Sequence, residues 1–125
     1  MNKDLFNAGL KTRREVLGAE HVEASIGNAT DFDMPMQEFT TQYAWGDVWS
    51  RPGLDRRTRS LLTLAMLTAL NRPHELRLHV RAALNNGVTK DQIKEVFLQT
   101  AIYCGVPAAI DSFRNAKDVF KEIGA

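Results

Sequence analysis

LLTLAMLTAL, residues 61–70, is the longest apolar stretch of the chain and the one that decides its fold class. It has about half the length of a membrane-spanning helix, and two threonines interrupt it. We therefore predict a helix in a protein core and no membrane span. A helix that is apolar on nearly all sides needs cover all round, and a chain of 125 residues provides little. We expect a homo-oligomer, closed about a symmetry axis, to supply the rest. The central helix of a monomeric bundle is the alternative.

Capping and helix-breaking residues on both sides of this stretch indicate further helices. Asp55 is placed to cap the stretch itself, and Asp33 is placed to cap an earlier helix with proline in its first turn. Downstream, Pro73 opens a helix that Gly87 closes, and the sequence from Thr89 onward is a capping box. No stretch alternates with the period of a strand, so we predict one all-α domain of six or seven helices over residues 1–125. The predicted helices cover residues 4–17, 21–26, 34–49, 56–70, 73–86, 90–103 and 108–123.

The overall composition excludes several classes of protein. The chain has 16 Lys and Arg against 15 Asp and Glu, a balance unlike that of a general nucleic-acid binder. Its single cysteine, Cys104, excludes an internal disulfide, a CxxC redox centre and a cysteine-based zinc site. The first 18 residues contain no uninterrupted apolar segment of the secretory type. We expect a cytoplasmic protein with a reduced and buried thiol and no membrane partner.

Arginine is concentrated between residues 51 and 81. This window holds seven arginines, no lysine and two acidic residues, a net charge of +5, whereas the rest of the chain carries −4. A guanidinium group binds a carboxylate through two parallel hydrogen bonds, which lysine does not do. The window therefore predicts a small ligand with more than one carboxylate, held by two or three of the arginines. Helix caps and inter-subunit ion pairs are the alternative, and a nucleic-acid site at residues 56–59 conflicts with the negative remainder.

The pair Glu75 and His79 is the candidate for acid–base chemistry. The two residues are four apart on a predicted helix, so they share a face. A carboxylate beside an imidazole fixes its orientation and favours its protonated form, which suits proton transfer near neutral pH. A surface ion pair is the alternative. We expect no metal site, because the chain has three histidines and His21 is distant in sequence.

Trp45 and Trp49 have the same spacing of four and stand shortly before Arg51. Aromatic residues at this spacing usually belong to a core. At a helix end followed by Arg-Pro-Gly they can instead form the wall of a pocket for a flat ring, and we take Trp45 as the candidate.

Three blocks of sequence carry a resemblance to a known family. They are WGDVWSRPGLDRRTRSLLTLAM at residues 45–66, HELRLHVRAALNNG at 74–87 and IKEVFLQTAIYCGVPAA at 93–109. Together they resemble the 4-carboxymuconolactone decarboxylases, and the likeness covers almost the whole chain. It implies an all-helical fold of the alkyl hydroperoxidase D-like type and a homo-oligomer, commonly a trimer or a hexamer.

The chain departs from the redox members of that superfamily. Those relatives carry CxxC followed by a histidine four residues later, and a relay glutamate on the preceding helix. Here Arg72 and Glu75 stand at the two cysteine positions, His79 keeps the histidine, and Ser60 stands at the glutamate. With both sulfurs absent we expect neither peroxide nor disulfide chemistry.

The resemblance implies cofactor-independent loss of CO2 from an unsaturated lactone dicarboxylate, in the protocatechuate branch of the β-ketoadipate pathway. The product is 3-oxoadipate enol-lactone. Decarboxylation or isomerisation of another small carboxylated lactone is one alternative. A non-catalytic helical assembly module is another, and it predicts that the charged residues face solvent or subunit contacts.

The site residues follow from the same resemblance. His79 is expected to donate the proton and Glu75 to orient it, although these two roles can be exchanged. The expected substrate-binding residues are Arg51, Arg72 and Arg81 for the carboxylates, Trp45 as pocket wall and Ser60 as a hydrogen-bonding group.

Overall fold

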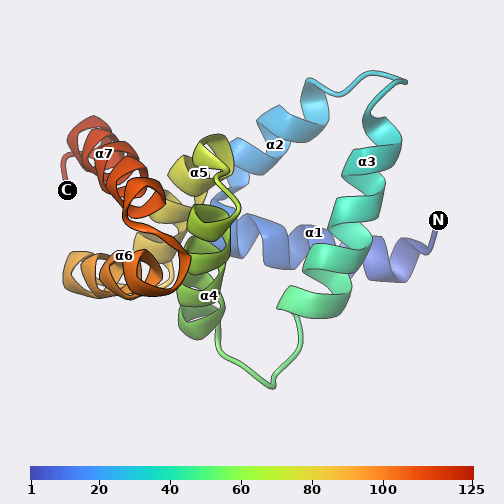
Figure 1. The fold of residues 1–125 in the computed structure, drawn as a ribbon. Coiled ribbons are helices and arrows are strands. Elements are labelled where there is room, and N and C mark those ends of the chain that lie inside the picture. Colours follow the sequence, from blue (N-terminus) through green and yellow to red (C-terminus); the bar gives the residue numbers. More distant parts are fainter. The chain divides into compact units, whose positions relative to one another are not determined.

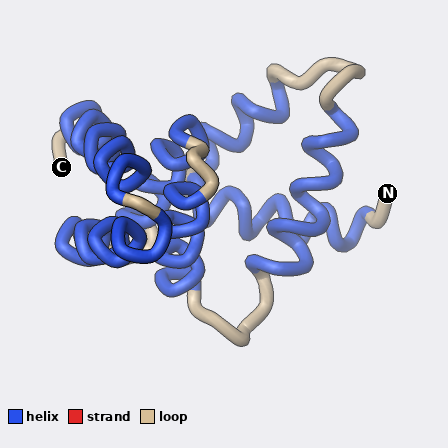
Figure 2. The backbone as a smooth tube through the Cα atoms, in the orientation of Figure 1, coloured by secondary structure: helices blue, strands red, loops and turns tan.

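The computed structural model describes residues 1–125 and consists of helices without strands (Figures 1 and 2). Seven α-helices and one π-helix confirm the predicted all-α class. None of them combines the length and the apolar character that crossing a bilayer requires. In chain order they are α1 (Lys3–Leu17), α2 (Ala19–Gly27), α3 (Met34–Phe39), the π-helix η1 (Thr40–Trp49), α4 (Arg56–Ala69), α5 (Pro73–Asn85), α6 (Lys90–Cys104) and α7 (Val106–Ile123). They form two compact units, Met1–Arg56 and Arg57–Ala125.

Most predicted helix boundaries are confirmed within a few residues, because they depend on local caps. Thr89 Oγ1 accepts the backbone N–H of Gln92 at 3.1 Å, and Gln92 Oε1 accepts that of Thr89 at 2.9 Å, which completes the capping box. Gly87 follows α5 with φ of +90°, a conformation in which glycine is not strained. Helix α7 begins at Val106, two residues earlier than predicted, because Pro107 fits the first turn of a helix.

Asp33 precedes α3 as predicted, but its side chain does not cap that helix. Its Oδ1 accepts the backbone N–H of Thr30 at 2.7 Å instead. The carboxylate therefore stabilises the turn before the helix, in the manner of other aspartates that bond to nearby backbone.

In the first unit, α3 and η1 form one continuous helix that α1 crosses (Figure 1). The sequence predicted this helix over 34–49 with the period of an α-helix throughout. The prediction is wrong for its second part, where the backbone is wound with the wider turn of a π-helix.

In the second unit, the core lies among α4, α5, α6 and α7. Its central side chains are fully buried, and the ring of Phe97 packs edge-on against Phe113 with 5.2 Å between the ring centres. The buried members of this core are Leu64, Leu76, Val80, Ala83, Val88, Ile93, Phe97, Ala116 and Val119.

Helix α4 is covered on one side only within the chain. Leu64 and Thr68 face the core and are buried, whereas Leu62, Met66 and Leu70 are 42%, 56% and 63% exposed. A single chain thus leaves part of the stretch 61–70 uncovered, as its short length led us to expect. That a homo-oligomer covers the rest stays a prediction.

Candidate active site

Helix α5 holds His79 at the edge of the core of the second unit. The helix starts at Pro73, whose fixed φ suits a first turn, directly after a turn in which Asn71 adopts φ of +57°. Leu76 and Val80 are buried and anchor the helix. His79 lies beside them, half-buried, with its Nδ1 shielded from solvent. The apolar neighbours on α5 therefore hold the imidazole at the boundary between core and solvent.

Glu75 lies one helical turn before His79 on α5 and is exposed. The structure records no hydrogen bond or ion pair between the two side chains. Its position in the first turn of the helix is favourable for a negative charge. The shared helix face is therefore present, and the orienting contact stays a prediction.

Ser60 is fully buried and joins α4 to the end of α5. Its Oγ accepts a hydrogen bond from Asn86 Nδ2 at 3.1 Å. The backbone N–H of Asn86 caps α5 at the carbonyls of Ala82 and Ala83. Sequence reasoning missed Asn86. The available signal was an asparagine directly before the closing glycine, a position that commonly ends a helix.

A second buried hydroxyl pair, also missed, joins α4 to α7. Thr68 Oγ1 donates to the carbonyl of Leu64 at 2.8 Å, and Ser112 Oγ lies 2.8 Å from the same hydroxyl. Because a hydroxyl has one proton, Ser112 is the donor in the second bond. These bonds satisfy polar groups that would otherwise destabilise the core.

The predicted substrate-binding arginines of the second unit differ in their surroundings. Arg81 and Arg77 both pair with Glu122 of α7, so part of the arginine window serves helix–helix contacts. Arg72 precedes α5, is exposed, and donates to the backbone carbonyl of Leu70 at 3.2 Å. No carboxylate pairs with Arg72 in the structure.

Trp45 and Arg51 belong to the first unit. Trp45 is buried on η1, and its ring centre lies 4.9 Å from that of Trp49. Arg51 is exposed, 3.9 Å from the carboxylate of Asp47. His79, Glu75, Arg72, Arg81 and Ser60 all belong to the second unit. The gathering of all seven residues into one site stays a prediction.

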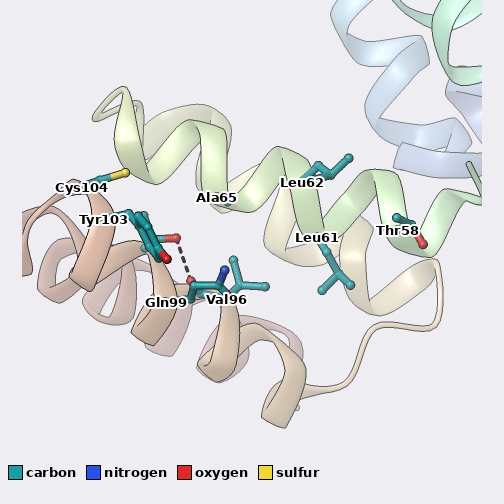
Figure 3. Close-up of a pocket in the computed structure, with 9 residues that line it drawn as sticks. Thr58, Leu61, Leu62, Ala65, Val96, Gln99, Tyr103 and Cys104 are labelled. Atoms are coloured by element: carbon teal, nitrogen blue, oxygen red, sulfur yellow. Dashed lines mark hydrogen bonds between the residues drawn. The ribbon is translucent and has the colours of Figure 1, made fainter.

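The second unit also contains a mainly apolar cavity of about 450 Å³ between α4 and α6 (Figure 3). Its size is that of a small-molecule pocket, and none of the predicted site residues lines it. One lining hydroxyl, that of Thr100, donates to the carbonyl of Val96 at 2.7 Å. The lining residues are Thr58, Leu61, Leu62 and Ala65 of α4, and Val96, Gln99, Thr100, Tyr103 and Cys104 of α6. The expectation that the thiol of Cys104 is buried is wrong, because this residue ends α6 and is exposed.

No group of three or more His, Cys, Asp or Glu side chains is arranged to hold a metal ion.

Comparison with known proteins gives consistent results. Residues 35–118 match the family model described as the carboxymuconolactone decarboxylase family. The chain is 51% identical over 119 residues to the 4-carboxymuconolactone decarboxylase of Acinetobacter baylyi, covering 95% of this chain and 89% of the relative. It is 50% identical over 112 residues to the nitrosuccinic acid decarboxylase of Metarhizium robertsii, covering 90% of this chain and 78% of the relative.

Proposed function

The chain belongs to the carboxymuconolactone decarboxylase family, and we propose that it converts 4-carboxymuconolactone to 3-oxoadipate enol-lactone and CO2 without a cofactor. The observation that carries the proposal is the 51% identity over 95% of the chain to an enzyme of that name. The half-buried His79 on α5 gives this chain a proton-transfer group of its own.

The substrate itself supplies most of the chemistry. It is a five-membered unsaturated lactone with one carboxylate on the ring and one on an acetate arm. When the bond from the ring to its carboxylate breaks, CO2 leaves. The electron pair moves through the ring double bond onto the carbonyl oxygen of the lactone. The resulting dienolate takes one proton at the ring carbon next to the carbonyl. The protein therefore has to hold the acetate arm, stabilise the negative oxygen and deliver the proton.

His79 is the proton donor in this proposal. Leu76 and Val80 fix its helix in the core, so the imidazole is held in place without large loop motions, and positioning of this kind lowers the barrier. Glu75 shares its face and orients the ring when substrate is bound. In the alternative assignment the protonated carboxyl of Glu75 donates, and His79 orients it. Ser60, through Asn86, keeps α4 and α5 together beside the site.

Arg72 is the best placed of the proposed arginines to hold the acetate arm, because no carboxylate of the protein competes for it. We predict that Arg72→Met raises KM by about 10- to 100-fold, the value of a lost charged hydrogen bond. Arg81→Met is the matched control within the window. Its guanidinium already pairs with Glu122, so we expect KM to change by less than about threefold.

The measurement is steady-state kinetics of both variants. Equal KM values for Arg72→Met and the wild type would contradict the assignment. A large rise in KM for Arg81→Met alone would transfer the role to Arg81. If neither variant raised KM, Arg51 would be the remaining candidate.

We further propose that the protein is a homo-oligomer, a trimer or a hexamer. Support comes from Leu62 and Met66 of α4 and from Leu70 directly after it, which are exposed to solvent in a single chain. Burying such side chains is favourable, and exposed apolar rows of this kind mark interaction surfaces.

A charge placed in this row should weaken the assembly. We predict that Met66→Glu, at a position 56% exposed in the single chain, sediments as a smaller species than the wild type. Lys117→Gln is the control, because it changes the net charge by the same amount at an exposed position of α7. The proposal fails if wild type and Met66→Glu both sediment as monomers, or as the same oligomer.

We propose that residues 1–125 act as one catalytic domain in the cytoplasm. The location in the cytoplasm is supported by Cys104, an exposed free thiol of the kind that persists in reducing compartments.

Nitrosuccinic acid is a second candidate substrate, because its decarboxylase is 50% identical over 90% of this chain. It too is a dicarboxylic acid, and its nitro group lies next to one carboxylate and can accept the same electron pair. The test is to measure kcat/KM for both acids with the same preparation. A higher kcat/KM for the lactone supports the proposal. A preference for nitrosuccinic acid overturns the substrate assignment, and turnover of neither overturns both.

A further inference from the structure

The π-helix η1 is unusual in its length. It runs for ten residues, Thr40–Trp49, directly after α3. A π-helical turn is rare and is mostly a single turn inserted in an α-helix. A run of this length therefore needs contacts from outside the helix to hold it, and α1 supplies them.

Gly9 of α1 lies against one wide turn of η1. A Cβ at Gly9 would stand 1.8 Å from the carbonyl oxygen of Thr41 and 2.8 Å from the backbone N of Gly46. Those two residues are five apart, which is the hydrogen-bonding period of a π-helix. The contact is reciprocal, since a Cβ at Gly46 would stand 2.5 Å from the carbonyl oxygen of Leu5. The backbones of α1 and η1 thus meet at this turn.

Arg13 lies one helical turn after Gly9 and is 6% exposed. Its Nη1 donates to Gln37 Oε1 at 2.9 Å and to Thr41 Oγ1 at 3.0 Å. Gln37 belongs to α3 and Thr41 to η1, so the guanidinium spans the point at which the winding changes.

The charge of Arg13 has no carboxylate partner in the structure, and burial lowers the pKa of its guanidinium. A buried charge among neutral groups contributes little to stability or reduces it. What the side chain provides here is geometry, because the two N–H groups of its planar Nη1 point in fixed directions and hold one acceptor each.

The far end of η1 is held as well. Ser50 Oγ donates to the carbonyl of Trp45 at 2.7 Å, and the hydroxyl of Thr12 lies 2.7 Å from Ser50 Oγ. Because the one proton of Ser50 is used on Trp45, Thr12 is the donor. The side chains of Trp45 and Trp49 belong to this end of η1, with ring centres 4.9 Å apart and ring planes at 33°.

We propose that Arg13 is a positioning residue that selects the π-helical form of η1 and so sets the direction of Trp45 and Trp49. If η1 were wound as an α-helix, every residue after Thr41 would rotate about the helix axis and Gly46 would leave Gly9. The consequence for catalysis rests on the proposed function and on the prediction from the sequence that Trp45 forms a wall of its pocket.

The two tryptophans of the chain both lie on η1, which provides a direct readout. Two indoles held at this distance and angle give an exciton couplet in circular dichroism, and Trp49→Phe identifies it by removing it. We expect Arg13→Met to lose the couplet while the helical signal remains. Arg14→Met is the control, since Arg14 is partly exposed and pairs with Glu23, and it should keep the couplet. A folded Arg13→Met with the wild-type couplet would overturn the proposal.

Thr41→Val keeps the proposal testable if Arg13→Met does not fold, because it removes one acceptor and retains the size of the side chain. We expect a weaker couplet, and an unchanged couplet in the folded variant would also overturn the proposal. In kinetics, a displaced pocket wall should raise KM while kcat stays within about twofold. If the wild type decarboxylates neither acid, the proposed function fails, and the couplet still decides the role of Arg13.

Discussion

Replacing His79 with alanine should lower the turnover number by at least about 100-fold, the smaller end of the contribution of general acid catalysis. The reason is that the dienolate formed on loss of CO2 then has no positioned donor for the ring carbon. His79 is half-buried at the edge of the core, so the substitution should leave the fold intact. The measurement is the rate of absorbance loss of enzymatically generated lactone, with circular dichroism as the check on folding.

His74 is the matched control for this prediction. It is also a histidine of α5, but it is exposed in the first turn, and His74→Ala should turn over at the wild-type rate. A His79→Ala variant with near wild-type turnover would remove His79 from the mechanism. If Glu75 were the donor instead, Glu75→Gln would show the larger loss.

Replacing Phe97 with alanine should give the largest loss of stability among single substitutions in the second unit. The side chain is fully buried on α6 and packs edge-on against Phe113. Its truncation removes buried apolar surface and leaves a cavity, which costs about 3–5 kcal/mol of the free energy of unfolding. Since small domains have about 5–15 kcal/mol in total, the variant should be partly unfolded at modest urea concentrations.

The control is Phe32→Ala, which removes the same side chain from a position that is 95% exposed. Its free energy of unfolding should change by less than about 0.5 kcal/mol. Urea denaturation followed by circular dichroism measures both variants at one protein concentration. Equal midpoints for the two would show that the core is not organised around Phe97.

Helix boundaries could be predicted from the sequence wherever the signal is local. The capping box at Thr89, the proline that opens α5 and the glycine that follows it each act within a few residues, and the structure confirms them. The winding of η1 could not be predicted, because the backbone of Gly9, more than thirty residues away, meets its wide turn. Asp33 precedes α3 as the sequence predicts, but its carboxylate accepts from the backbone of Thr30, before the helix, and not from the first turn of α3.

In the candidate site, too, local features could be predicted from the sequence and long-range contacts could not. The period of α5 already places His79 next to the apolar face that Leu76 and Val80 define. The pairing of Arg81 with Glu122 joins residues 41 apart in sequence, and no local pattern reveals it.

Arg13 was missed although a signal existed. It lies on the same face of α1 as Gly9 and Val16, at the spacing of residues that face inward. An arginine on the inward face of a helix was therefore visible in the sequence. Its two acceptors, on helices that follow later in the chain, were not.

The central claim is that the chain releases the ring carboxylate of 4-carboxymuconolactone as CO2 without a cofactor. The most direct measurement uses substrate labelled with carbon-13 either in the ring carboxylate or in the acetate arm, with dialysed enzyme and a metal chelator. We predict one labelled CO2 for each lactone consumed from the first substrate, and unlabelled CO2 from the second. Label released from the acetate arm, or lactone consumed without CO2, would contradict the claim.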